Sequence, residues 1–371
     1  MIIAINCRLN KAAQPEGYDE FLQHILNSLT TKFSQHRFLY IFDKPYPQLI
    51  AFAENVTPIV TGPETKTVLR LQYWLNYTLP AVLRKHHADV FVSLDGTCSL
   101  RTKIPQCLLI PDLNFLQQPP AVKRSLAKFY KKYTPAFMAK AKAIATVSAY
   151  TQQRIAGMYA TEATDIALIH PVADAVFKPM DWEAKEPVME KYSNGKAYFL
   201  YSGRIDQGSN IINLLKAFTF FKQRQKSNMQ LVIAGNADEG FKKELGNYRL
   251  RNEVVLLENL SRAELAAVTA AAYAMIYPVL HAGLALNPLQ AMRAGVPVVA
   301  ANSESLTAIC GAAAIYCNPA DVKDMAENMM LLFKDEDMAA RLVRAGHELI
   351  KQYDQERSAD MLMQCIVTCT G

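Results

Sequence analysis

The chain contains 371 residues, of which 51% are hydrophobic and 20% are charged. These proportions exclude disordered, collagen-like and low-complexity proteins, and a chain of this length is expected to fold as about two domains. The 40 Lys and Arg residues against 34 Asp and Glu residues give a net charge of +6, a mildly basic balance that allows an anionic ligand without requiring nucleic acid.

The cysteines and the N-terminus both favour a cytoplasmic protein. None of the seven cysteines forms a C-x-x-C pair, and some lie in apolar runs such as Cys107–Ile110. We therefore expect small buried thiols in a reducing compartment rather than a disulfide framework or a zinc site. The apolar segment Met1–Asn6 has no basic flank, so it predicts a first strand and not a signal peptide.

Short apolar runs alternate with helical patterns along the chain. The predicted strands of the first half are Ile2–Asn6, Phe38–Phe42, Val90–Ser93, Cys107–Ile110 and Ile144–Val147. Those of the second half are Tyr198–Ser202, Gln230–Ala234, Val254–Leu257, Ala274–Tyr277 and Pro297–Ala300. Periodicity predicts helices between them, such as Tyr18–Phe33, Ile211–Phe221 and Ala320–Phe333. This alternation is typical of parallel sheets covered by helices on both faces.

The strand pattern is interrupted once, at Lys178–Asn194, where polar and proline-containing sequence appears. We place a linker there, which predicts two doubly wound α/β domains at residues 1–178 and 179–355. Ligands of such sheets bind beyond the carboxyl ends of the strands, so the cleft between two facing domains is the expected site. NAD and FAD are not expected, because the turn after the first strand of each half lacks G-x-G-x-x-G.

The segment from Leu265 to Met292 has no charged residue and is long enough to cross a bilayer. It nevertheless divides into elements of a globular domain. Ser261–Glu264 is a capping box that starts a helix, and Ala274–Tyr277 reads as a buried strand. Asn287 as cap with Pro288 at the first helical position predicts a second helix start. We therefore expect no membrane span.

This second helix start follows a glycine-containing loop, an arrangement that suits a diphosphate. The first turn of a helix presents backbone N–H groups and the positive end of its dipole. Arg204, directly after the first strand of the same half, adds a fixed positive charge. Taken alone, each of these pieces is an ordinary strand–helix turn.

Taken together with other segments, they resemble the family-4 glycosyltransferases of the GT-B architecture. The matching segments occur in the family's order over nearly the whole chain: Asn6–Leu9, Asp95–Gly96, Pro111–Phe115, Ala145–Ser148, Ala175–Pro179 and Tyr277–Val299. The resemblance implies two facing Rossmann-like domains, with a nucleotide-sugar bound by the second and the acceptor by the first. It also implies transfer with retention of anomeric configuration, no metal ion or other cofactor, and a C-terminal helix, residues 356–371, that returns to the first domain.

The resemblance also assigns site residues. On the donor side it implies Arg204, Ser209, Leu260, Ala282, Gly283, Leu284 and Gln290. On the acceptor side it implies Gly17, Asp95 and Asp112.

Most side chains that the family uses for chemistry are replaced here. The family's two glutamates fall at Ala282 and Gln290. Its phosphate-binding lysine falls at Ser209 and its histidine at Pro111. Gln290 keeps a carbonyl acceptor for a ribose hydroxyl, and Ser209 can cap the helix that follows it. Of the family's chemical side chains, only Arg204 remains.

A further feature is the stretch from Leu113 to Thr161, which contains no acidic residue. Arg124, Lys128 and Lys132 recur at i, i+4 spacing and so share one face of a predicted helix. That face is either a solvated surface or a peripheral contact of Lys123–Lys142 with the inner face of a membrane. Family members that use lipid-linked acceptors often dock in this way.

Two functions remain open from the sequence. The first is a glycosyltransferase that uses a nucleotide-sugar and a glycan or lipid-linked acceptor. The second is a catalytically inactive pseudoenzyme that binds a nucleotide-sugar or serves as the partner subunit of an active transferase. Donor hydrolysis or sugar transfer distinguishes the two, and nucleic acid is not an expected partner of either.

Overall fold

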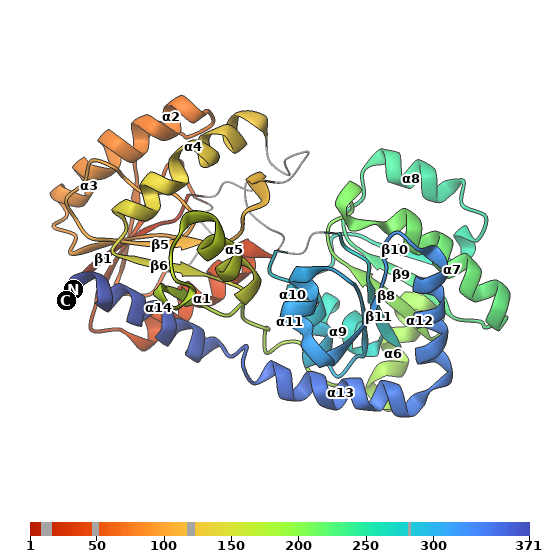
Figure 1. The fold of residues 1–371 in the computed structure, drawn as a ribbon. Coiled ribbons are helices and arrows are strands. Elements are labelled where there is room, and N and C mark those ends of the chain that lie inside the picture. Colours follow the sequence, from red (N-terminus) through yellow and green to blue (C-terminus); the bar gives the residue numbers. More distant parts are fainter. Residues whose placement is uncertain (9–16, 47–51, 117–122, 281–282) are drawn as a thin grey trace. The chain divides into compact units, whose positions relative to one another are not determined.

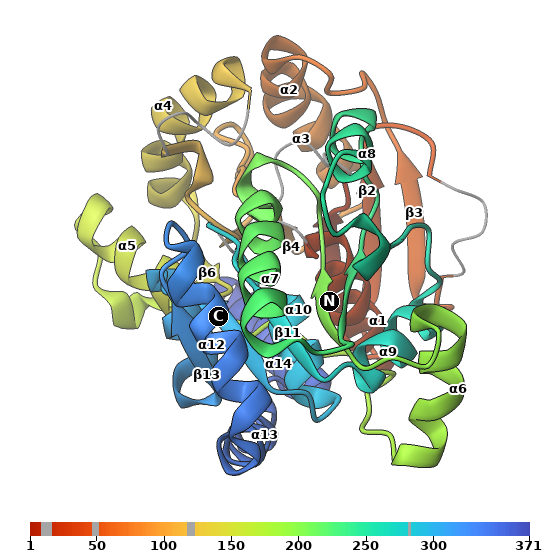
Figure 2. The same ribbon diagram turned by 90° about the vertical axis from the view of Figure 1, so that its right-hand side faces the viewer.

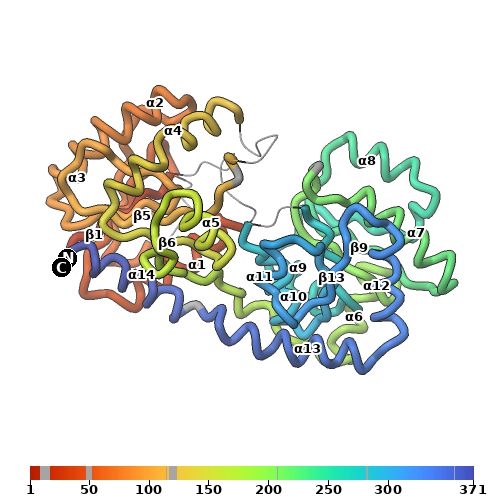
Figure 3. The backbone as a smooth tube through the Cα atoms, in the orientation of Figure 1, coloured from red at the N-terminus to blue at the C-terminus, as the bar shows by residue number. Residues whose placement is uncertain are grey.

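The structure, a computed structural model, describes residues 1–8, 17–46, 52–116, 123–280 and 283–371. Within these residues the chain forms two compact units. Unit 1 comprises Met1–Val172 together with Gln355–Gly371, and unit 2 comprises Ala173–Asp354. Figure 3 traces the chain from unit 1 into unit 2 and back into unit 1.

Unit 1 is built on a parallel sheet. Its strands are β1 (Ile2–Asn6), β2 (Arg37–Phe42), β3 (Val56–Val60), β4 (Val90–Ser93), β5 (Gln106–Ile110), β6 (Ala143–Thr146) and β7 (Ile166–Leu168). They lie in the order β3-β2-β1-β4-β5-β6-β7. The predicted strands of this half are confirmed, but β3 and β7 were not predicted. Both are edge strands, and Pro58 is tolerated in β3 because an edge strand can spare a backbone donor.

Helices cover both faces of this sheet. They are α1 (Tyr18–Lys32), α2 (Val68–Tyr73), the π-helical turn η1 (Trp74–Thr78), α3 (Leu79–Lys85), η2 (Asn114–Leu116), α4 (Arg124–Lys140), α5 (Ala149–Tyr159), η3 (Ala163–Asp165) and α14 (Gln355–Thr370). Figure 1 shows α2, α3 and α4 on one face, while α1 and α14 pack together on the other. The buried strands are apolar almost throughout, as expected for a parallel sheet enclosed on both sides.

Unit 2 has a second parallel sheet. Its strands are β8 (Tyr198–Ser202), β9 (Gln230–Ala234), β10 (Val254–Leu257), β11 (Ala274–Tyr277), β12 (Val298–Ala301) and β13 (Ala314–Cys317). Their order is β10-β9-β8-β11-β12-β13. The order reverses between β8 and β11, so the carboxyl ends of these two strands mark the switch point where such sheets bind ligands. The predicted strands of this half are confirmed, whereas the edge strand β13 was missed.

The helices of unit 2 also form two layers. They are α6 (Trp182–Ser193), η4 (Gln207–Ser209), α7 (Ile211–Gln225), α8 (Glu239–Gly246), η5 (Arg251–Glu253), α9 (Arg262–Ala271), α10 (Leu286–Arg293), α11 (Glu304–Cys310), η6 (Gly311–Ala313), α12 (Val322–Lys334) and α13 (Glu336–Ile350). Helices α7 and α12 pack against each other, and α9 contacts both α6 and α10 (Figures 1 and 2). Throughout the described residues, no helix combines the length and the apolar character needed to cross a membrane.

The predicted linker at Lys178–Asn194 is wrong, because most of it forms α6. The carboxylate of Asp181 caps this helix by accepting the backbone N–H of Ala184 at 2.9 Å. Asn194 ends it in the left-handed conformation at φ 51°. The compact units divide at Val172, a few residues before the predicted boundary. Local polarity and Pro187 suggested a linker, although capping and tertiary packing make the segment helical.

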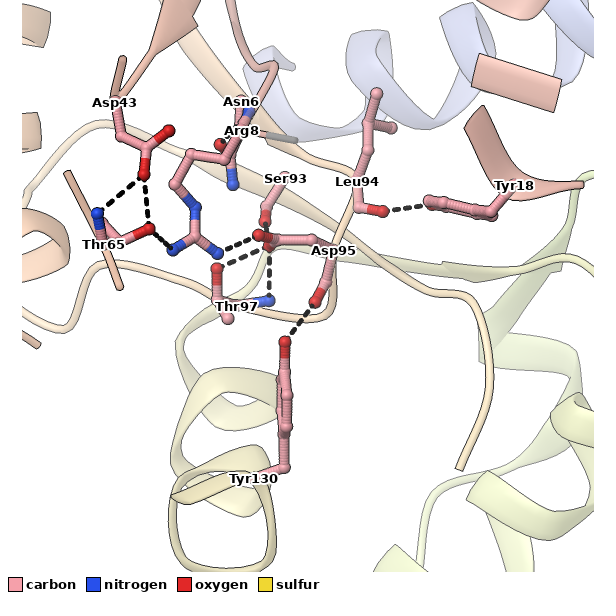
Figure 4. Close-up of polar contacts among 10 residues, drawn as sticks. All are labelled: Asn6, Arg8, Tyr18, Asp43, Thr65, Ser93, Leu94, Asp95, Thr97 and Tyr130. Atoms are coloured by element: carbon pink, nitrogen blue, oxygen red, sulfur yellow. Dashed lines mark hydrogen bonds and ion pairs between the residues drawn. The ribbon is translucent and has the colours of Figure 1, made fainter. Parts of the chain in front are cut away.

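A buried polar network joins the carboxyl ends of β1, β2 and β4 (Figure 4). Arg8, just beyond β1, forms an ion pair with Asp95, just beyond β4. A second guanidinium nitrogen of Arg8 donates to the Thr65 hydroxyl at 3.1 Å, and Thr65 donates to Asp43 at 2.5 Å. Asp95 also accepts a 2.6 Å hydrogen bond from the Thr97 hydroxyl. Arg8 is 3% exposed and Asp95 is 9% exposed, so this ion pair is largely shielded from water.

Arg8 and Asp95 each keep the other ionised. Burial alone would raise the pKa of Asp95, but the Arg8 charge and hydrogen bonds from Thr97 and Ser93 hold that pKa below its ordinary value. Burial alone would lower the pKa of Arg8, and the Asp95 charge raises it instead. Both groups are therefore ionised at neutral pH, and removing either one leaves an unpaired buried charge.

We predict that Arg8→Met lowers the free energy of unfolding by about 3–5 kcal/mol, because Asp95 is left buried without its partner. The double variant Arg8→Met with Asp95→Leu should recover most of this loss, since it removes both charges. Urea unfolding at neutral pH measures both effects. Equal losses in the single and double variants would contradict this account of the pair.

The same pair sets an acid limit on stability. The folded pKa of Asp95 lies below that of the unfolded chain, so its stabilising effect is complete above about pH 4 and is lost as the pH falls through the folded pKa. The difference in unfolding free energy between the protein and Asp95→Asn should stay constant down to about pH 5 and shrink below about pH 4.

Candidate functional site

In unit 2 the candidate site is built on the turn that follows β8. Gly203 has a φ of 143°, a conformation that favours glycine. A Cβ on Gly235, at the end of β9, would lie 2.1 Å from the Gly203 carbonyl oxygen, so only glycine fits there. Arg204 directly follows Gly203, and its side chain is 54% exposed. The backbone carbonyl of Arg204 accepts a 2.7 Å hydrogen bond from the Tyr201 hydroxyl. The turn thus fixes the backbone from which a positive charge projects.

Asp206 and Ser209 close this turn. The Asp206 carboxylate accepts the backbone N–H groups of Gly208 at 2.8 Å and Ser209 at 3.0 Å. The Ser209 hydroxyl donates to the Asp206 carbonyl at 2.5 Å and accepts the Asp206 N–H at 3.3 Å. The prediction that Ser209 caps the following helix is therefore wrong. Asn210 occupies the cap position of α7, because the hydroxyl of Ser209 already completes the preceding capping box.

A hydrogen bond connects this turn to the loop after β11. The N–H of Leu280 donates to the Gly208 carbonyl at 3.0 Å. Beyond the loop, α10 begins at Leu286, and Ala285 holds the cap position in the left-handed conformation at φ 49°. The predicted start, with Asn287 as cap, is therefore wrong, since both Asn287 and Pro288 already lie in the helix. The positive end of the α10 dipole still lies at Leu286, a few residues after Leu280, whose N–H is bonded to Gly208.

The other predicted donor-side residues differ in their exposure. Leu284 is fully buried, and Gln290 on α10 is 2% exposed. Leu260, in the loop after β10, is half-buried. The capping box predicted directly after it, formed by Ser261 and Glu264, is confirmed. Gly283 is partly exposed. Ala282 lies outside the described residues.

An acidic hollow adjoins the same turn. It measures about 740 Å³ with its open mouth included, and its lining contains Asp206, Ser209, Asp238 and Glu244. Three carboxylates repel a diphosphate, so the anion is expected on the Arg204 side of the turn rather than in this hollow.

In unit 1 the predicted acceptor-side residues Asp95 and Asp112 line one small hollow. It measures about 350 Å³ with its mouth included, and Gly96 and Pro111 also line it. Phe115 and Tyr130 form an aromatic wall, with ring centroids 5.3 Å apart and planes inclined by 25°. The Tyr130 hydroxyl donates to the Asp95 carbonyl at 3.1 Å. Gly17 is not among the lining residues; it starts α1 with a φ of 77°.

The sequence analysis did not single out the partners that hold Asp95. Arg8 and Asp43 each lie just beyond a buried strand, at the carboxyl edge of the sheet. Polar residues at that position of a parallel sheet are candidates for a site, so this rule would have indicated both, whereas Asp95 was assigned by the family resemblance. Thr65 gave no such signal, because the strand before it was not predicted.

Comparisons with known proteins agree with this architecture. Residues 184–349 match the family model described as glycosyl transferases group 1. The O-antigen chain mannosyltransferase B of Escherichia coli is 24% identical over 249 residues, which cover 66% of this chain and 65% of that protein, less than two thirds of its length. The O-antigen chain mannosyltransferase RfbU of Salmonella typhimurium is 22% identical over 325 residues, or 85% of this chain and 86% of that protein.

Among solved structures, Anabaena Alr3699/HepE in complex with UDP and glucose superposes with a TM-score of 0.73 at 13% identity. The match covers 98% of this chain and 99% of that chain, and at this identity it shows the fold alone. The predicted pair of Rossmann-like α/β domains is confirmed. The fold of the chain is therefore that of GT-B glycosyltransferase structures, and residues 184–349 are similar to glycosyl transferases group 1.

Proposed function

We propose that this chain transfers a mannosyl group from a nucleoside-diphosphate donor to a glycan acceptor, with retention of anomeric configuration. One observation carries the proposal: the exposed Arg204 projects from a turn that is hydrogen-bonded to the loop before α10, within the residues similar to glycosyl transferases group 1. The mannosyltransferase relatives support the choice of sugar. The structure of a related fold with UDP supports a nucleoside diphosphate as the leaving group.

The residues of unit 2 supply two sources of positive potential for a diphosphate. The guanidinium of Arg204 provides a full charge, and the first turn of α10 provides the positive end of a helix dipole. Departure of the sugar leaves negative charge on the diphosphate. Positive groups that are already in place at this position therefore stabilise the transition state. Asp206, whose carboxylate lies 3.9 Å from Arg204, is held by two backbone N–H groups of its own turn. We therefore assign no metal ion to the site.

In unit 1 we assign the acceptor to the hollow beside Asp95. The carboxylate of Asp112 offers acceptors for sugar hydroxyls, and Phe115 with Tyr130 offers an apolar wall for a sugar ring. Burial raises the pKa of Tyr130, so its hydroxyl remains a neutral donor to the Asp95 backbone.

A second candidate function is a pseudoenzyme that binds the donor without transferring it. Ser209 stands where the family has a phosphate-binding lysine, and its hydroxyl is committed to the Asp206 turn. Pro111, at the position of the family's histidine, lines the hollow of unit 1 without a polar side chain. These two observations favour donor binding without efficient chemistry.

A surface of unit 1 supports contact with an anionic membrane. Helix α4 exposes Arg124, Lys128, Lys131 and Lys132, and it packs beside α2 (Figure 1). From α2 and η1 project three exposed apolar side chains: Leu69 at 78%, Tyr73 at 53% and Tyr77 at 49%. Basic residues beside exposed apolar and aromatic side chains are typical of proteins that settle at the headgroup region. We propose that this surface brings the protein to a lipid-linked acceptor.

We predict that Arg204→Ala weakens binding of GDP or UDP by about 10- to 100-fold, the loss expected for one charge-assisted contact. Isothermal titration calorimetry of the purified protein measures the effect. Arg224→Ala, at the far end of α7, is the matched control and should bind as the parent does. Unchanged affinity in Arg204→Ala would show that the diphosphate does not bind at this turn.

We predict that the purified protein hydrolyses or transfers sugar from GDP-mannose at the same rate with and without EDTA. Arg204→Ala should lower this rate by about 100-fold or more, because a group that stabilises the leaving diphosphate is lost. Donor binding with no detectable turnover would favour the pseudoenzyme. Loss of activity in EDTA that Mn²⁺ restores would contradict the metal-free site.

We predict that the protein co-sediments with vesicles containing phosphatidylglycerol and not with pure phosphatidylcholine vesicles. Lys128→Glu with Lys132→Glu should abolish the binding, whereas the same reversal at Lys323 and Lys334 on α12 of unit 2 should not. Added salt should weaken binding, because the attraction is largely electrostatic. Equal binding to both kinds of vesicle would contradict the assignment.

A further inference from the structure

Tyr201 is a fully buried tyrosine near the carboxyl end of β8, two residues before Gly203. Its ring stacks against the ring of Tyr277 on β11, with centroids 6.2 Å apart and planes inclined by 14°. Tyr277 is itself 2% exposed. Because β8 and β11 are neighbours in the sheet, both rings lie at the switch point of unit 2. A ring enclosed in this way has few alternative orientations, so the Tyr201 hydroxyl is held in one place.

The Tyr201 hydroxyl is hydrogen-bonded to the residue that carries the exposed charge of the candidate site. It donates to the backbone carbonyl of Arg204 at 2.7 Å. A tyrosine hydroxyl inside a protein needs a hydrogen-bond partner, and here the partner belongs to the turn after β8. The bond therefore joins a rigid, buried ring to the backbone from which the guanidinium projects.

The backbone around Arg204 is held at three points. Before it, the N–H of Gly203 donates to the Ala234 carbonyl at 2.9 Å. After it, the carboxylate of Asp206 accepts two backbone N–H groups of its own turn. Gly203 has a φ of 143° and no side chain that could restrain the peptide group between these two anchors. The bond from Tyr201 to Arg204 supplies the restraint in the middle.

We propose that Tyr201 is a positioning residue for the diphosphate: its hydroxyl fixes the backbone of Arg204 and thereby the place of the guanidinium that meets the anion. The inference rests on the proposed function, because it takes Arg204 as the contact of a nucleoside diphosphate. Tyr201 is fully buried, so it acts through Arg204 and not by touching the ligand. A cation that is already in place binds an anion more strongly than one that must be ordered on binding, since less conformational entropy is lost.

The same strand offers a matched control in Tyr198. This residue begins β8 and is also fully buried. Its hydroxyl donates to the Val268 carbonyl on α9 at 2.6 Å. Tyr198→Phe therefore removes the same group from the same strand and deprives a backbone carbonyl of the same kind of donor, but at the amino end of β8. An effect of lost stability alone should be similar in Tyr198→Phe and Tyr201→Phe.

The first measurement is isothermal titration calorimetry of the full chain with GDP and with UDP. Tyr201→Phe should weaken binding of the nucleotide by about 3- to 10-fold, the loss expected for one neutral hydrogen bond. Tyr198→Phe should bind as the parent does. Urea unfolding of both variants shows whether their losses of stability are comparable.

The second measurement is a double-mutant cycle, which tests whether Tyr201 acts through Arg204. When Arg204→Ala is already present, Tyr201→Phe should cause no further loss of affinity, because the guanidinium that it positions is gone. A merely structural role of Tyr201 would lower the affinity by the same factor in both backgrounds.

Three results would overturn the proposal and leave the proposed function in place, provided that Arg204→Ala weakens binding. They are parental affinity in Tyr201→Phe, an equal loss in both backgrounds of the cycle, and a loss in Tyr198→Phe as large as that in Tyr201→Phe. By contrast, a parent protein that binds neither nucleotide, or an Arg204→Ala variant that binds as the parent does, would overturn the proposed diphosphate site and this inference with it.

Discussion

The carboxyl edge of the first sheet depends on one buried ion pair. Arg8, Asp43 and Asp95 lie just beyond β1, β2 and β4 at this edge. Arg8 links the other two, because its guanidinium reaches Asp95 on one side and, through the Thr65 hydroxyl, Asp43 on the other. Such a pair adds little net stability compared with well-packed apolar residues, but it joins the residues that lie just beyond β1 and β4. The floor of the hollow in unit 1 is therefore set by electrostatics rather than by shape alone.

In unit 2 the carboxyl ends of the strands are held together by backbone geometry rather than by a buried ion pair. Gly203 and Gly235 let the ends of β8 and β9 approach more closely than residues with a Cβ would allow. The Asp206 turn then satisfies its own N–H groups, which leaves Arg204 as the charged side chain that projects from the turn. Unit 1 thus buries the Arg8–Asp95 pair, whereas unit 2 keeps the charge of Arg204 at its surface.

The sequence predicted the central strands well because they are enclosed on both faces and are apolar in nearly every position. It failed at the edges: β3 contains a proline, β7 is very short, and β13 lies at the far end of its sheet. The structure places Arg204 exposed after β8 and Asp95 beside a hollow, and their roles in a site stay predictions. The roles of Ser209 and Asn287 were wrong, because each depends on which neighbour takes a hydrogen bond first, and spacing does not encode that competition. The network around Arg8 joins residues far apart in the chain, so a local pattern can indicate the residues but not which of them pair.

The discontinuity of unit 1 has a consequence for how the protein is made. Helix α14 covers one face of the first sheet, yet its residues follow all of unit 2 in the chain. On a ribosome, unit 2 has all its residues available while the first sheet still lacks this cover. Unit 1 must therefore wait, with apolar surface open to solvent and to chaperones, until residues 355–371 emerge. The unit whose sheet precedes unit 2 in the chain is thus the unit that is completed after it.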